Sequence, residues 1–198
     1  MTRPVWSYLV AAPVLWLAAT GILLGAHVEI IEGNPASKVK VYIYEDLQCS
    51  DCLTLRTLLD EKLLPRYGSR VAFVHRDYPL PKHEWAREAA LAGRWIYERN
   101  HVAGIEFRRE ILSEQNHITL QGLPSWLRLF ALRNHLDPDG ATQCLSDHQL
   151  LADLEHDIQA GAGRGVKKTP TLYIGNVSFV ETILYEDVAH ALDIELGH

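Results

Sequence analysis

The sequence predicts an α/β fold in which a long all-helical insertion interrupts a small sheet. Three observations support this fold class. A β-branched run, Val39 to Tyr44, leads directly into Cys49-Ser50-Asp51-Cys52 and then into a helical pattern. Apolar residues recur at helical spacing over about residues 83–165. Two short apolar runs then flank Gly175-Asn176, as in a β-hairpin. The 198 residues allow one such domain and an additional segment.

Turn and helix-ending residues separate the first elements. Val28 to Ile31 is expected to be a small edge strand, ahead of the main strand from Val39. Leu53 to Leu64 carries leucines at helical spacing, and Pro65 with Gly68 is expected to end that helix. A run of Val, Phe and Ala predicts the second main strand over residues 70–76.

The insertion, residues 83–165, contains several predicted helices. Alanines and Gly93 give one packed stripe, and Leu123-Pro124 starts another helix, because proline is tolerated in a first turn. Asp137-Pro138 is expected to cap and start a short helix that carries Cys144. A further helix covers residues 150–158, and the glycines up to Gly165 end it.

The chain returns to the sheet after the insertion. Thr171 to Ile174 and Val177 to Val180 are predicted to pair as a hairpin, since Gly-Asn suits a two-residue turn. Glu186 to Leu196 is predicted to be the terminal helix.

The C-x-x-C spacing suits a redox pair at the start of a helix. Residues three apart on a helix lie one above the other, close to the separation that a disulfide requires. The unpaired backbone N–H groups and the helix dipole favour the thiolate at Cys49, the position nearer the helix end. A thiolate is the attacking species in disulfide exchange, and Cys52, one turn deeper, would resolve the mixed disulfide.

The N-terminal segment, residues 1–26, is predicted to be a membrane anchor. Val5 to Ala26 carries no charge over about 22 residues, enough to span a bilayer as a helix. Arg3 before it and the acidic flank after it favour an extracytoplasmic location for residues 27–198. One alternative is a cleaved signal peptide that ends at Leu24-Gly25-Ala26, which would leave the domain extracytoplasmic and soluble. The other alternative is a buried helix of a soluble protein.

Charge and cysteine content exclude several classes of function. A net charge of -6 argues against nucleic-acid binding, which requires a basic surface. Three cysteines are too few for a disulfide scaffold. A zinc site would need two more ligands, and neither a second C-x-x-C nor an H-x-x-x-H motif follows the first pair. No metal site is therefore expected.

Three motifs together resemble the DsbA-like branch of the thioredoxin superfamily, in particular its membrane-anchored bacterial members. The similarity covers roughly Pro35 to Leu192. The motifs are Tyr44-Glu45-Asp46-Leu47-Gln48-Cys49-Ser50-Asp51-Cys52, Arg76-Asp77-Tyr78-Pro79-Leu80 with His83 and Ala86, and Gly165-Val166-Lys167-Lys168-Thr169-Pro170-Thr171.

The resemblance implies a thioredoxin fold with a helical lid and assigns roles to four residues. Cys49 is the expected nucleophile and Cys52 the resolving cysteine. Thr169-Pro170 is expected to be a cis peptide beside the pair, with the Thr169 backbone exposed to bind an extended substrate. The resemblance also implies a membrane redox partner, such as a quinone-linked oxidase, that recycles the disulfide.

The dipeptide between the cysteines departs from the family pattern, which usually begins with proline. Asp51 places a carboxylate near both sulfurs and is expected to raise the Cys49 pKa. We therefore expect a weaker oxidant than the strongly oxidising members of the family. Asp46 or Glu45 is a candidate for the acid that moves protons at Cys52, but a capping or solvated carboxylate explains either residue as well. Cys144 is expected to be a buried, inert thiol rather than a second redox centre, which is the alternative.

The sequence thus predicts an extracytoplasmic thiol–disulfide oxidoreductase of the bacterial inner membrane, with its catalytic domain on the periplasmic side. It would oxidise cysteine-containing protein substrates through the Cys49–Cys52 disulfide, and it needs no bound cofactor because the disulfide is the reagent. The alternatives are a disulfide reductase or isomerase, and a non-catalytic module that binds proteins in the groove at Pro170.

Overall fold

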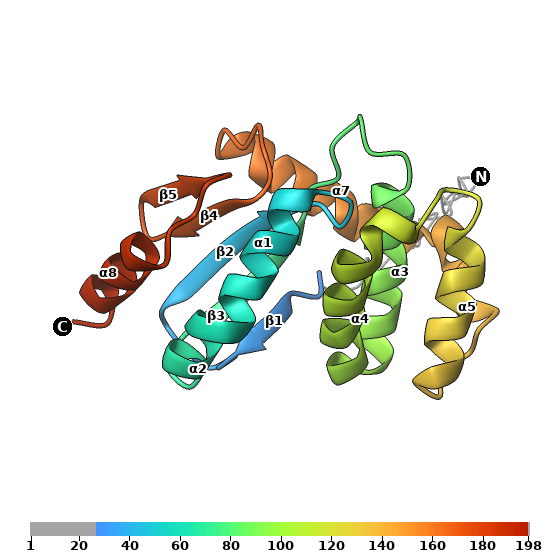
Figure 1. Cartoon of the computed structure of the whole chain (residues 1–198), viewed down its shortest axis with the longest axis horizontal. Coiled ribbons are helices and arrows are strands. Elements are labelled where there is room, and N and C mark those ends of the chain that lie inside the picture. The colour runs from blue at the N-terminus through green and yellow to red at the C-terminus, as the bar shows by residue number, and fades with distance from the viewer. Residues whose placement is uncertain (1–26, 198) are drawn as a thin grey trace, which may run out of the picture.

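A mixed sheet with strand order β1-β3-β2-β4-β5 lies at the centre of the fold (Figure 1). The computed structural model describes residues 27–197. Strands β2 and β3 are parallel, and the other neighbouring pairs are antiparallel. The strands are β1 (Ile30–Gly33), β2 (Lys40–Glu45), β3 (Ala72–Asp77), β4 (Thr171–Ile174) and β5 (Val177–Val180).

Most of the helices lie between β3 and β4 in the chain, as the sequence predicts. The helices before β3 are α1 (Ser50–Leu58), the π-helical turn η1 (Leu59–Leu63) and α2 (Leu64–Tyr67). Those of the insertion are α3 (Ala86–Arg99), α4 (His101–Glu114), η2 (Gln115–His117), α5 (Leu123–Arg133), α6 (Gly140–Gln143), η3 (Cys144–Ser146) and α7 (His148–Gly163). The final helix, α8 (Tyr185–Glu195), follows the hairpin.

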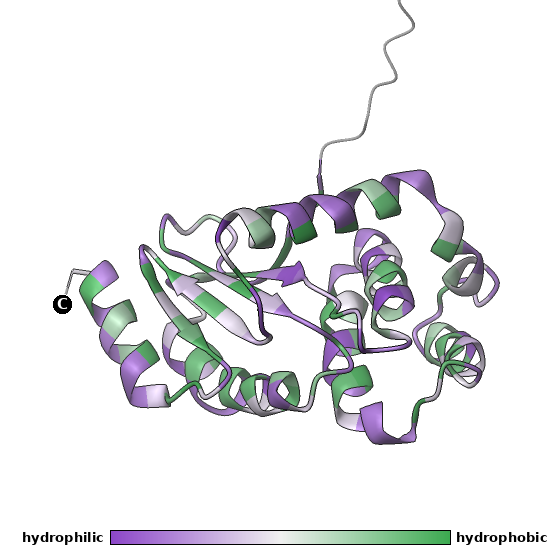
Figure 2. Ribbon diagram, turned by 90° about the horizontal axis from the view of Figure 1, so that it is seen from above, coloured by the Kyte–Doolittle hydropathy of each residue, from purple (hydrophilic) through white to green (hydrophobic). Residues whose placement is uncertain are grey.

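Helices cover both faces of the sheet (Figure 2). On one face, α1, η1 and α8 bury a core that includes Val41, Ile43 and Phe73. On the other face lies α7, which approaches closely at Gly161. A Cβ atom at Gly161 would lie 2.8 Å from the Tyr78 ring and 3.0 Å from the Tyr44 ring, so only glycine allows this helix to pack so near.

A second apolar core joins α1 to the helical insertion. It contains Cys49 and Cys52 together with large side chains of the insertion, among them Trp85, Phe107 and Phe130. The cysteine pair therefore lies where the sheet layer meets the inserted helices. Packing of the insertion thus determines the surroundings of both sulfur atoms.

The hairpin forms where the sequence predicts it. Ile174 pairs with Val177 across the turn, and Gly175 has a φ of +54°. A two-residue hairpin turn of this kind requires a positive φ, which glycine adopts without strain. The predicted strand boundaries of β4 and β5 are confirmed.

The structure corrects the predicted end of the first helix. The helix does not stop at Pro65 but runs on to Tyr67, and Gly68 follows its last residue. The π-helical turn η1 ends at Leu63, so Pro65 falls in the first turn of α2, where its missing N–H group costs nothing.

Other predicted boundaries shift by a few residues. The edge strand is Ile30–Gly33 rather than Val28 to Ile31, and the short helix near Cys144 starts after Asp139 rather than at Asp137-Pro138. Cys144 itself lies in η3. The predicted anchor or signal, residues 1–26, lies outside the described residues.

A buried network of ion pairs ties the insertion to the sheet. Arg108 of α4 contacts Glu45 of β2 at 2.9 Å and Asp77 of β3 at 2.6 Å. Arg94 of α3 contacts Asp77 at 2.9 Å and also pairs with Asp157 of α7. All five side chains are buried, so the network fixes how three inserted helices sit against two central strands.

Candidate active site

The two cysteines occupy unequal positions at the start of α1. Cys49 is the residue before the first helical turn and is 7% exposed. Cys52 lies within that turn and is 0% exposed. Both are free thiols in this structure. The arrangement leaves Cys49 slightly accessible from a pocket and Cys52 fully buried, as a nucleophile and a resolving thiol require.

Hydrogen bonds stabilise the Cys49 thiolate. The Cys52 thiol is the largest influence and lowers the pKa of Cys49, with help from the backbone N–H groups of Cys52 and Asp51. Partial burial opposes this effect, but the pKa still falls to about 6. The helix N-terminus therefore acts on Cys49 as the sequence predicts.

The Asp51 side chain is exposed at the pocket, and its backbone N–H group lowers the Cys49 pKa. The Cys49 pKa as a whole falls rather than rises, because the hydrogen bonds to its sulfur, that of the Cys52 thiol first, outweigh partial burial. The effect of the Asp51 carboxylate itself stays a prediction.

Cys52 has the opposite electrostatic environment. Burial raises its pKa well above the ordinary value of 9.0, and its interaction with Cys49 and the charge of Glu45 add to the rise. The backbone N–H of Asp46 lies 3.4 Å from its sulfur. At neutral pH Cys52 is therefore a protonated thiol while Cys49 is mostly a thiolate.

We predict that the reduced protein shows one thiolate titration with a midpoint near pH 6. Absorbance at 240 nm, which reports thiolate, should rise through that midpoint. The step should vanish in Cys49→Ser and persist in Cys144→Ser, because burial raises the pKa of Cys144 to about 12. A midpoint near 9 in the wild-type protein would contradict the hydrogen-bond assignment.

Thr169-Pro170 is a cis peptide beside Cys49, as predicted. The Cys49 thiol donates a hydrogen bond to the Thr169 carbonyl at 3.3 Å. The Pro170 carbonyl accepts from the Glu181 N–H at 2.9 Å. Thr169 is only 3% exposed, so the expectation of an exposed Thr169 backbone is wrong for the dithiol form.

Asp46 and Glu45 are both buried, so neither is a solvated carboxylate. Glu45 contacts His75 at 2.5 Å and Arg108 at 2.9 Å. Burial raises the pKa of Glu45, but the charges of Arg108 and His75 outweigh it and hold the pKa well below its usual range. Glu45 thus remains ionised and contributes to the raised pKa of Cys52.

Asp46 faces the loop that follows β3. Its carboxylate accepts hydrogen bonds from the Gln48 N–H at 2.8 Å, the Leu80 N–H at 2.6 Å and His83 Nδ1 at 2.7 Å. Sequence alternation did not separate the roles of the two acids. The structure assigns Glu45 to the environment of Cys52 and Asp46 to the support of the neighbouring loop.

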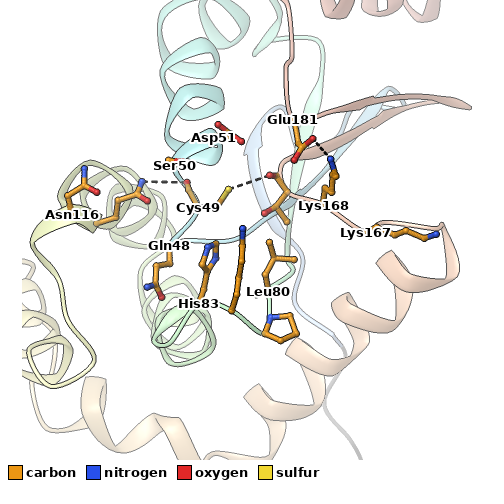
Figure 3. A pocket seen from close by; sticks show the side chains of 14 residues that line it. Gln48, Cys49, Ser50, Asp51, Leu80, His83, Asn116, Lys167, Lys168 and Glu181 are labelled. Atoms are coloured by element: carbon orange, nitrogen blue, oxygen red, sulfur yellow. Dashed lines mark hydrogen bonds and ion pairs between the residues drawn. The ribbon is translucent and has the colours of Figure 1, made fainter.

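A pocket of about 690 Å³ opens beside the Cys49 sulfur (Figure 3). Its walls come from the turn before α1, residues 80–83, η2 and the loop before β4. Two of its polar residues, His83 and Gln115, were not among the predicted site residues. Gln115 lies 3.5 Å from the Cys49 carbonyl and His83 binds Asp46. The motif Leu80 to His83 is the sequence signal that indicated part of this wall.

A group of potential metal ligands lies away from the cysteines. His27, His156 and Asp157 place one ligand atom each within 4.8 Å of one another. Arg76 lies 2.7 Å from the Asp157 carboxylate and 3.3 Å from a ring nitrogen of His27, and Arg94 also pairs with Asp157. These two cations already neutralise the carboxylate, so the geometry disfavours a metal ion there.

Residues 26–194 match the family model described as Thioredoxin. No curated protein sequence matches the chain significantly. Within residues 27–197, no helix is both long and apolar enough to cross a membrane.

Several solved structures share the fold at low identity. Oxidised BdbD from Bacillus subtilis has a TM-score of 0.71 and 17% identity, covering 86% of this chain and 94% of that chain. Alpha-DsbA1 from Wolbachia pipientis has a TM-score of 0.72 and 17% identity, covering 87% of this chain and 92% of that chain. The thiol-disulfide exchange protein alpha-DsbA2 from Wolbachia pipientis has a TM-score of 0.68 and 20% identity, covering 83% of this chain and 86% of that chain.

Proposed function

The chain belongs to the thioredoxin family, and from this membership we propose that it is a thiol–disulfide oxidoreductase that oxidises substrate cysteines. The observation that carries the proposal is the opposite pKa shift of the two thiols. The pKa of Cys49 falls to about 6 while that of Cys52 rises well above 9.0. A structural disulfide needs no such difference, whereas an exchange reaction needs one reactive and one protected sulfur.

The reaction proceeds through a mixed disulfide at Cys49. A substrate thiolate attacks the Cys49 sulfur of the Cys49–Cys52 disulfide, and Cys52 leaves. A second substrate thiolate then attacks the substrate sulfur and releases Cys49 as its thiolate. The low pKa of Cys49 makes it the better leaving group in this second step.

Thr169 and Pro170 are proposed to bind the substrate chain. When Cys49 is a protonated thiol, its S–H group donates to the Thr169 carbonyl and occupies that acceptor. A disulfide or mixed disulfide at Cys49 has no such hydrogen, so the carbonyl can then accept an N–H group of an extended substrate. Pro170 has no N–H of its own to compete for that role.

The lowered pKa of Cys49 favours the oxidising direction. A fall from 9.0 to about 6 stabilises the dithiol form at pH 7 by about 1.4 kcal/mol, which corresponds to about 30 mV for a two-electron couple. A stabilised dithiol makes the disulfide a stronger oxidant. The Cys49–Cys52 disulfide is the reagent, and the proposal requires no other cofactor.

The proposed location is the periplasmic side of a bacterial inner membrane. The uncharged stretch Val5 to Ala26 supports an anchor, or a signal that is cleaved from a soluble periplasmic form. An oxidising compartment allows a disulfide of this kind to persist. A membrane redox partner would then reoxidise the dithiol after each cycle.

Equilibration with glutathione buffers tests the direction of electron flow. For an oxidant we expect a reduction potential more positive than about −180 mV at pH 7. A value of about −200 to −230 mV, the range of glutaredoxins, or about −270 mV, that of thioredoxin, would contradict the oxidising direction and favour a reductase or isomerase. Complete failure of the pair to exchange would favour the non-catalytic binding module.

A further inference from the structure

His83 is a titratable side chain in the Cys49 pocket to which the proposed mechanism gives no role. It lies in the loop between β3 and α3, and its side chain is mostly buried, with 16% exposed. Figure 3 shows its ring entering the same pocket as the Cys49 sulfur. A histidine that only capped the following helix would have no reason to face this cavity.

Asp46 holds the His83 ring in one orientation. The Asp46 carboxylate is 1% exposed and accepts from His83 Nδ1 at 2.7 Å. The backbone N–H groups of Gln48 and Leu80 fix the carboxylate from two sides. Because a carboxylate accepts, Nδ1 carries a hydrogen, and Nε2 is left as the nitrogen that gains or loses a proton.

Nε2 is free to act in the pocket. Among residues 27–197, no hydrogen bond or ion pair engages this atom. A carboxylate that orients one ring nitrogen of a histidine and leaves the other free is the arrangement that activates nucleophiles in many enzymes. Here the reactive sulfur and the histidine share one cavity.

We propose that His83 is the acid–base residue of the Cys49 pocket, which accepts the proton of the incoming substrate thiol, and that Asp46 is its positioning residue. The inference rests on the proposed function, because it concerns the same reaction. It assigns the proton transfer at the substrate sulfur, whereas the charge of Glu45 affects the pKa of Cys52.

The proton transfer accompanies the first exchange step, in which every bond that forms is matched by one that breaks. The S–H bond of the substrate breaks and its proton passes to His83 Nε2. The substrate sulfur bonds to the Cys49 sulfur, the Cys49–Cys52 bond breaks, and Cys52 leaves with the electron pair. The substrate sulfur is oxidised and the Cys52 sulfur is reduced. In the reverse direction, the protonated ring returns the proton to the departing substrate thiolate.

Other charged groups around the pocket do not titrate in the same way. Asp46 precedes α1 and Asp51 lies in its first turn, Lys82 is on the same loop as His83, Lys167 lies on the loop before β4, and Lys168 is paired with Glu181 at 2.6 Å. Lysine and carboxylate side chains ordinarily keep their charge between pH 6 and 9. Cys49 does not titrate in the oxidised protein, since its sulfur is in the disulfide. A pH effect in that range therefore reports His83 and the substrate thiol.

The test is the pH dependence of the reduction of the oxidised full chain by reduced glutathione, followed by tryptophan fluorescence in a stopped-flow instrument. A thiolate-only reaction slows about tenfold per pH unit below the thiol pKa of about 8.5. With His83 as the base, the wild-type rate should fall less steeply between pH 8.5 and 6.5. His83→Asn should restore the steep slope, because its amide donates to Asp46 but takes no proton.

We expect His83→Asn to be slower than wild type by at least about tenfold at pH 6.5 and nearly equal to it at pH 9.5. The equilibrium reduction potential should not change, because an acid–base residue speeds both directions equally. Lys82→Gln is the matched control: it removes a charge from the same pocket, so any effect should be uniform across pH.

Three results would overturn the assignment. These are a rate loss in His83→Asn that is the same at every pH, a profile identical to wild type, and a shift of the potential as large as the rate change. His83→Gln replaces the asparagine variant if the latter does not fold. If wild type exchanges with glutathione while the His83 variants match it, only this inference fails; if wild type does not exchange at all, the proposed function fails.

Discussion

Cys49→Ser should abolish thiol–disulfide exchange, whereas Cys52→Ser should retain the first step and stop there. Cys49 is the thiolate near neutral pH, and the two thiols that remain in Cys49→Ser, Cys52 and Cys144, are both buried with raised pKa values. The reduced proteins are incubated with oxidised glutathione at pH 7 and their intact masses are measured. Cys49→Ser should carry no adduct, and Cys52→Ser should accumulate one glutathione.

Wild type should proceed to the internal disulfide under the same conditions, because Cys52 displaces glutathione from Cys49. Cys144→Ser is the matched control and should behave as wild type, since Cys144 is buried and burial raises its pKa to about 12. A stable adduct on Cys49→Ser, or the loss of exchange in Cys144→Ser, would show that the wrong sulfur has been assigned as the nucleophile.

Arg108→Met should lower the free energy of unfolding by about 3–5 kcal/mol, the cost of removing one partner from a buried ion pair. Arg108 is 1% exposed and contacts the Glu45 carboxylate at 2.9 Å and the Asp77 carboxylate at 2.6 Å. Methionine keeps the apolar stem of the side chain but leaves both buried carboxylates without this cation. Urea unfolding at pH 7 of wild type and variant measures the difference.

Arg128→Met provides the surface counterpart of this change. Arg128 is half-exposed and pairs with Asp139 at the surface of the insertion, so its loss should cost no more than about 1 kcal/mol. Equal, small effects of the two substitutions would mean that water or rearranged side chains compensate the buried network. A large effect confined to Arg108 supports its role in holding the insertion on the sheet.

The first helix shows how far local sequence rules reach. Leucine spacing predicted its position, and Gly68 was correctly placed just after its end. Pro65 was expected to stop it, because proline usually breaks the hydrogen-bond ladder. The π-helical turn at Leu59–Leu63 changes the register of that ladder and lets proline start a new turn. Such a turn depends on how Leu59 and Leu63 pack against the sheet, which local patterns do not encode.

The two acids near the cysteines, Glu45 and Asp46, also show that local sequence patterns do not determine contacts between distant segments. Sequence alternation did not show which of Glu45 and Asp46 faces the sulfur atoms, because the partners of each come from distant segments. Glu45 meets Arg108, 63 residues away, and Asp46 meets His83, 37 residues away. Their burial, and the pKa of the Glu45 carboxyl, follow from those partners rather than from neighbours in the chain.

The sequence by itself determined the features that rest on neighbouring residues. These are the strand that leads into Cys49-Ser50-Asp51-Cys52, the helix start whose N–H groups help to lower the Cys49 pKa, and the hairpin at Gly175-Asn176. The cis peptide before Pro170 was implied by the family resemblance of its motif. Only the tertiary structure decided which acid acts on Cys52 and that His83 enters the pocket of Cys49. The reason is physical: backbone conformation and helix-end electrostatics act over one turn of chain, whereas burial and charge pairing depend on where the inserted helices pack.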